Sequence, residues 1–122
     1  MIFAKLSLAA PVLLALALPA RAGIPEIEAV RATPQGESWN FAVTLSHPDT
    51  GWDHYADAWE VLDADGNVLG QRILVHPHVN EQPFTRSLGG VAVPAGTTRV
   101  FLRARCTVDG WGQTLFPYDL PE

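Results

Sequence analysis

The chain has 122 residues, of which 48% are hydrophobic and 17% charged, and its formal net charge is −5 at pH 7. A chain of this length has room for one domain with one modest core. The acidic balance argues against nucleic acid as a partner, because binding to a polyanion depends on clustered cations that release counterions.

Residues 1–22 have the pattern of a secretory signal. Lys5 is the single charge before an apolar run over residues 6–20, and the run closes on the sequence ARA, the small-x-small pattern of a signal peptidase site. The run is shorter than the roughly 20 residues of a membrane span. We therefore expect cleavage after Ala22, no membrane attachment after cleavage, and a periplasmic or secreted protein. Cleavage would leave six Arg against thirteen Asp and Glu, a net charge of −7.

Residues 23–122 are expected to form a single domain whose rhythm is that of β-strands. Apolar and polar residues alternate, short segments are separated by Pro and Gly, and no segment keeps a 3.6-residue period. In the hairpin expected over residues 58–75, Gly66 or Asn67 supplies the positive φ of a tight turn. The other strands are expected near residues 27–33, 38–47, 84–93, 99–108 and 114–120. Seven short strands in about 100 residues predict an all-β sandwich.

The order of these strands resembles an immunoglobulin or fibronectin type III fold over the whole of residues 23–122. Trp59 lies where such domains keep a buried tryptophan on the third strand, and Cys106 lies where they keep their second cysteine. The chain departs from the pattern at Val43, the apolar residue opposite, and at Ala104, where a tyrosine corner would be. The resemblance thus implies an Ig-like sandwich without an intrachain disulfide. The motifs GWDHYADAWEV and HPHVNEQPFTRSL also resemble those of small secreted bacterial domains of unassigned function.

Cys106 is the only cysteine in the chain. By the period of two it points inward from its strand, so we predict a buried thiol with the packing role of a small hydrophobic side chain.

Three loops, at residues 47–57, 76–82 and 108–112, should meet at one end of this sandwich. Loops on a rigid sandwich commonly carry function, so we place the candidate site there. The polar and aromatic side chains expected at this end are His47, Asp49, Trp52, Asp53, His54, Asp57, His76, His78, Glu81, Asp109 and Trp111.

The histidines of these loops indicate a transition-metal site. Strand parity assigns outward positions to His54, His76 and His78, which would bring the three rings to one rim, with His47 nearby. Neutral imidazoles with a carboxylate suit Zn²⁺ or Cu²⁺. The acids of the same loops, Asp53, Asp57 and Glu81, are candidates to hold the second ring nitrogens.

Two other interpretations remain open at this point. The histidines and acids could be a hydrogen-bonded plug that closes the sandwich end, since buried polar groups need partners whatever the function. Alternatively, Trp52 and Trp111 could be stacking surfaces for a protein or carbohydrate partner, or lids over the core. No nucleophile motif or phosphate-binding loop is present, so we expect a binding module and not an enzyme, with no catalytic residue assigned. A small metal-dependent hydrolase is the third alternative, and it would need a cleft and an open coordination position.

Overall fold

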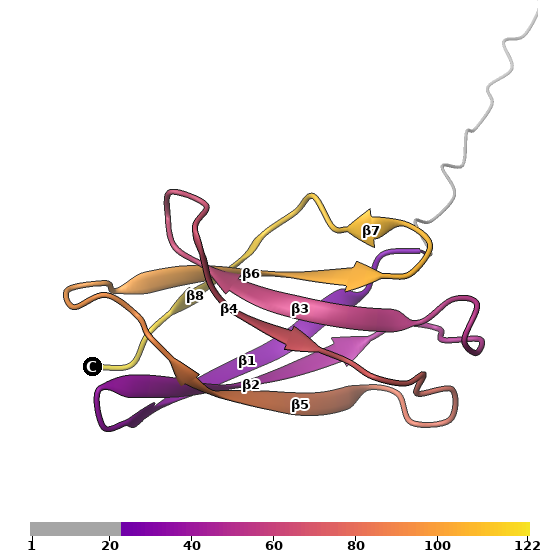
Figure 1. The fold of residues 1–122 in the computed structure, drawn as a ribbon, viewed down its shortest axis with the longest axis horizontal. Coiled ribbons are helices and arrows are strands. Elements are labelled where there is room, and N and C mark those ends of the chain that lie inside the picture. The colour runs from indigo at the N-terminus through magenta and orange to yellow at the C-terminus, as the bar shows by residue number, and fades with distance from the viewer. Residues whose placement is uncertain (1–22) are drawn as a thin grey trace, which may run out of the picture.

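Eight β-strands and no helix make up residues 23–122, the part of the chain that the computed structural model describes (Figure 1). The predicted signal sequence, residues 1–22, lies outside the described residues. The strands are β1 (Glu26–Gln35), β2 (Ser38–Ser46), β3 (Ala56–Leu62), β4 (Val68–Ile73), β5 (Phe84–Val91), β6 (Arg99–Cys106), β7 (Gly110–Trp111) and β8 (Phe116–Asp119). No helix in the described part of the chain is long and apolar enough to cross a membrane.

The strands form two antiparallel sheets that pack face to face. One sheet has the order β1-β2-β5, and the other has the order β4-β3-β6-β7 with β8 also paired to β6. Figure 1 shows the two layers one above the other. The all-β prediction is therefore confirmed, whereas the described residues contain eight strands where we expected seven.

In the strands with alternating apolar and polar residues, the apolar residues predicted to face the core are buried. Phe41, Val43 and Leu45 of β2 are fully buried, and so are Trp59 of β3 and Cys106 at the end of β6. The period of two places these side chains between the sheets, where burial of apolar surface stabilises the fold. Cys106 is unpaired and buried, as predicted from its parity.

The parity that we predicted for β4 is wrong. The outward positions predicted for His76 and His78 imply inward positions for Ile73 and Val75, but the exposed fractions of these two residues are 53% and 71%, and Leu74 between them is buried. The pairing of β3 with β4 shifts register so that Leu69 has no partner opposite it. The extra residue of such a bulge moves Ile73 to the outer face. Strand parity does not extend beyond Ile73, where β4 ends, and of the two histidines that follow, His76 is exposed and His78 is buried and not outward.

The additional strand β7 lies where we expected only a loop. Chain reversal after Cys106 is tight, Gly110 has a φ of 76°, and Trp111 pairs with Arg105 of β6. The ring of Trp111 lies 4.8 Å from the guanidinium carbon of Arg103, on the outer face of the sheet. Trp111 is therefore a partner of a charged surface residue and not a lid over the core.

Candidate functional site

The loops that follow β2, β4 and β6 lie at one end of the sandwich, which is the right-hand end in Figure 1. The chain enters this end at Gly23, just before β1. A tight turn presents His54, since Thr50 donates to the His54 carbonyl at 3.0 Å and His54 donates to the Gly51 carbonyl at 3.2 Å. The backbone of the first loop is thus fixed by its own hydrogen bonds before any side chain is considered.

A buried carboxylate, Asp49, ties these loops together. Its Oδ1 accepts from the backbone N–H of Ala56 at 3.0 Å and contacts Nδ1 of His47, and its Oδ2 accepts from the backbone N–H of His78 at 2.8 Å. The exposed fractions of Asp49 and His47 are 5% and 2%. Gln82 adds a link, because its Oε1 accepts from the His47 backbone N–H and its Nε2 donates to the His78 carbonyl. This hydrogen-bonded network is the kind of plug that the sequence left open as an interpretation.

His47 has an oxygen acceptor at each ring nitrogen. Nδ1 faces Asp49, and Nε2 lies 3.0 Å from the carbonyl oxygen of Gly23. A neutral imidazole has one N–H, so it can donate to only one of the two oxygens. Both contacts are hydrogen bonds together only when the ring is a cation. A metal ion at Nε2 would satisfy the ring equally well, because Nδ1 would keep its proton for Asp49.

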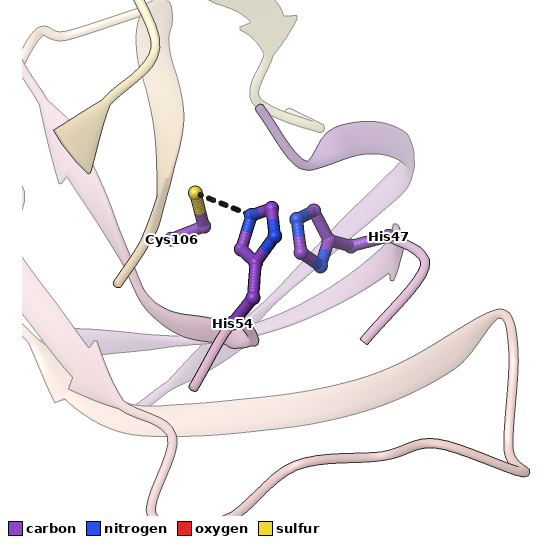
Figure 2. A group of neighbouring side chains, drawn as sticks. All are labelled: His47, His54 and Cys106. Atoms are coloured by element: carbon purple, nitrogen blue, oxygen red, sulfur yellow. Dashed lines mark hydrogen bonds between the residues drawn. The ribbon is translucent and has the colours of Figure 1, made fainter. Parts of the chain in front are cut away.

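His54, Cys106 and Asp109 form a triangle of potential ligand atoms beside His47. Sγ of Cys106 is 3.5 Å from Nε2 of His54, Oδ2 of Asp109 is 3.6 Å from that sulfur, and the same oxygen is 3.8 Å from the His54 nitrogen. Figure 2 shows His54 between Cys106 and His47, with the rings of the two histidines close together. The candidate ligand atoms of His47, His54 and Cys106 all lie within 4.8 Å of one another.

The surroundings of Cys106 keep its thiol protonated in the absence of a metal. Burial raises the pKa of the Cys106 thiol, an effect that the backbone N–H groups of Asp109 and Val108 partly oppose. The Asp109 N–H donates to the sulfur at 3.2 Å. A backbone donor aimed at the sulfur also suits a thiolate, the form of cysteine that binds metal ions.

Of the described residues, His47, His54 and Cys106 form a group able to hold a metal ion, and His76 and His78 do not join it. The latter two lie beside each other, with ring centroids 4.6 Å apart. His78 stacks on Phe84 at 3.9 Å, and its Nε2 faces Nη2 of Arg86 at 2.8 Å. Because arginine can only donate, that nitrogen of His78 is an acceptor and is already engaged.

His78 is held as a neutral ring. Burial, followed by the positive charge of Arg86, lowers the pKa of His78. Its Nδ1 is buried and has no hydrogen-bond partner among the described residues. His78 thus packs the end of the sandwich while Arg86 also contacts Glu81, 3.4 Å away.

The remaining residues expected at this end have separate surroundings. Asp53 is exposed and uses its backbone carbonyl to accept from Thr107. Asp57 lies 3.5 Å from Arg105 on the neighbouring strand. Trp52 is 67% exposed and contacts Tyr55 edge to face. These side chains neither touch the triangle through a hydrogen bond nor hold the second nitrogen of a histidine.

From the sequence, we predicted no role in the site for two of its members, Asp49 and Cys106. Asp49 stands two residues after His47, a spacing that allows a carboxylate to reach the ring of its neighbour. Cys106 stands three residues before Asp109. The turn between them brings both the backbone N–H and the carboxylate of Asp109 to the Cys106 sulfur.

The descriptions of the known proteins that this chain resembles name no activity. No protein-family model matches the chain. A protein of Halomicrobium mukohataei described as a putative lipoprotein is 46% identical over 77 residues, which are 63% of this chain and 37% of that protein. The chain thus spans little more than a third of the length of that relative. A crystal structure of a hypothetical protein from Pyrococcus horikoshii aligns with a TM-score of 0.51 at 14% identity, covering 80% of this chain and 88% of the other, which shows a shared fold alone.

Proposed function

We propose that this protein is a binding module for a transition metal ion, Zn²⁺ or copper, held by His47, His54, Cys106 and Asp109. The observation that carries the proposal is the triangle of His54, Cys106 and Asp109. In tetrahedral coordination, bonds of about 2.0–2.3 Å place ligand atoms about 3.3–3.8 Å apart. The edges of 3.5, 3.6 and 3.8 Å are close to these separations without any movement of the chain.

His47 would complete the coordination as the fourth ligand. The carboxylate of Asp49 accepts from Nδ1, and Nε2 is then the atom with a lone pair for the metal. Binding there replaces the contact with the Gly23 carbonyl, so the metal takes over from a proton on a ring that is nearly inaccessible to solvent. His54 and Asp109, with side chains 25% and 45% exposed, provide the route by which an ion would enter.

The ligand set suits Zn²⁺ and copper for different reasons. Two imidazoles, a thiolate and a carboxylate satisfy the four positions that Zn²⁺ prefers. Two imidazoles and one thiolate are also the main ligands of mononuclear copper centres, with a weaker fourth donor. We therefore retain both ions, and the metal content of the purified protein distinguishes them.

The compartment and the finer fold assignment belong to the same proposal. We infer a periplasmic or secreted protein from the expected signal sequence, and the description of the relative as a lipoprotein supports an envelope location. The separation of β1-β2-β5 from β4-β3-β6-β8 supports an Ig-like sandwich with an added strand beside β3. The acidic charge supports the absence of nucleic-acid partners.

The test is metal analysis of untagged protein, followed by melting curves with Zn²⁺ or Cu²⁺ as the only added ligand. One equivalent of metal should bind, and an ion present at a hundredfold excess over Kd should stabilise the fold by about 2.7 kcal/mol. For a domain of this size that is a rise in Tm of about 10–20 °C.

A pair of matched histidine variants identifies the site. His54→Ala should abolish the metal-dependent rise, because it removes one vertex of the triangle. His76→Ala should retain it, because that exposed ring lies outside the ligand group. Loss of the rise in His76→Ala alone, or no response of the native protein to either ion, would refute the proposal.

An interaction surface is the second candidate function. Trp52 is 67% exposed beside an open depression of about 570 Å³ whose lining includes His76 and Val79. An exposed aromatic ring at such a place suits a protein or carbohydrate partner. Trp52→Ala should leave metal binding intact, so the two functions can be separated by experiment.

A further inference from the structure

Gly23 lies against the proposed metal site, although it precedes the first strand. Its carbonyl oxygen is 3.0 Å from Nε2 of His47, the nitrogen proposed as a ligand. A Cβ built on Gly23 would fall 1.4 Å from Oδ2 of Asp109, so its Cα is in contact with that carboxylate. No residue with a side chain fits here unless Asp109 moves away.

The backbone nitrogen of Gly23 is therefore close to the candidate ligand atoms. It is one bond from the Cα, and standard bond lengths then place it within about 4.5 Å of Asp109 Oδ2. This separation is comparable with the 4.8 Å spread of the candidate ligand atoms of His47, His54 and Cys106.

The chemistry of this nitrogen depends on whether the chain is cut after Ala22. In the uncut chain it is a peptide nitrogen, which is a much poorer metal ligand because its lone pair is delocalised into the carbonyl. After the expected cleavage it is a free α-amine with an ordinary pKa of about 7.7–8.0, which offers a lone pair near neutral pH. Processing at the sequence ARA would thus create a new nitrogen donor at the site.

We propose that the α-amino group of Gly23, released by signal cleavage, is a ligand of the metal ion bound by His47, His54 and Cys106. This inference rests on the proposed metal-binding function and specifies how the site is completed. The amine either replaces the carboxylate of Asp109 as a ligand or binds the ion beside it. Metal binding would then be tighter in the processed protein, after it has left the compartment of synthesis.

The test compares three proteins that differ only at the first nitrogen. The first begins at Gly23, as produced by export and confirmed by N-terminal sequencing. The second keeps Ala22, so that the Gly23 nitrogen is an amide, and the third begins at an acetylated Gly23. Affinities for Cu²⁺ and Zn²⁺ are measured by competition with a chelator, and melting curves without metal establish that the three proteins fold alike.

We expect the free Gly23 form to bind at least about tenfold more tightly than both blocked forms, a difference of about 1.4 kcal/mol. Incorporation of ¹⁵N-glycine should also change the nitrogen hyperfine pattern in the electron paramagnetic resonance spectrum of the Cu²⁺ complex. Equal affinities within twofold and an unchanged spectrum would overturn this inference and leave the metal site in place. A mature chain that does not begin at Gly23 would overturn it as well. No binding by any form would overturn both proposals.

Discussion

Asp49→Asn is the most informative single change, because the carboxylate of Asp49 serves both the fold and the proposed metal site. The substitution conserves shape but turns one acceptor oxygen into a donor. Asp49 receives hydrogen bonds from the backbone of Ala56 and His78 and contacts the ring of His47. In the variant, at least one of these buried donors faces another donor.

The cost can be worked from these contacts. A buried donor without an acceptor costs about 1–3 kcal/mol, and the charge-assisted bonds of Asp49 are roughly twice as strong as neutral ones. We therefore expect Asp49→Asn to lower the free energy of unfolding of the metal-free protein by about 2–4 kcal/mol. For a domain of this size, the corresponding fall in Tm is about 10–25 °C.

The assay is urea denaturation of metal-free protein at pH 7, with Asp119→Asn as the control. Asp119 pairs with Arg99 through a 2.7 Å contact, but its side chain is 72% exposed, so solvent screening leaves this surface pair little effect on stability. Metal affinity should fall about 10–100-fold in Asp49→Asn, since the carboxylate orients the His47 ring, and should not change in the control. Equal stability of the two variants would refute the role assigned to Asp49.

Two further predictions concern the titratable groups of the same end. Burial lowers the pKa of His78, so the folded protein favours the neutral ring. The contribution of this ring to the free energy of unfolding is therefore complete above the unfolded pKa of about 6.5 and is lost as the pH falls below that value. Urea denaturation between pH 5 and 7.5 should show a steeper acid loss in the native protein than in His78→Phe, and parallel curves would contradict this. The raised pKa of the Cys106 thiol predicts that metal-free protein resists iodoacetamide until urea unfolds it, which mass spectrometry can follow; rapid labelling of folded protein would contradict the burial of the sulfur.

The strands could be predicted from the sequence because apolar alternation is a local property. Phe41, Val43 and Leu45 follow one another at a spacing of two, and their burial needs only that the segment be extended. The bulge at Leu69 could not be predicted in this way. It depends on how β4 aligns with β3, and neither segment alone contains that register.

The location of the candidate site could be predicted, but its composition only in part. Loop positions follow from strand order, so the end that holds His47 and His54 was expected. Cys106 was assigned to the core because its parity is inward, and parity does not show where the core ends. As the last residue of β6, Cys106 faces inward at the level where apolar packing gives way to His54 and Asp109.

The polar network and the proposed metal site share His47, so the stability of the fold and the occupancy of the site are coupled. In the metal-free protein, the ring satisfies Asp49 and the Gly23 carbonyl together only as a cation. A metal ion at Nε2 removes that requirement, because Nδ1 alone then carries the proton that Asp49 accepts. The single cysteine forms no intrachain disulfide, so bound metal would take the place of a covalent link between the loops after β2 and β6. The gain should fade as the pH falls and protons compete for the imidazoles and the thiolate, and it should shrink when Asp49 is replaced, since the His47 ring is then less firmly oriented toward the ion.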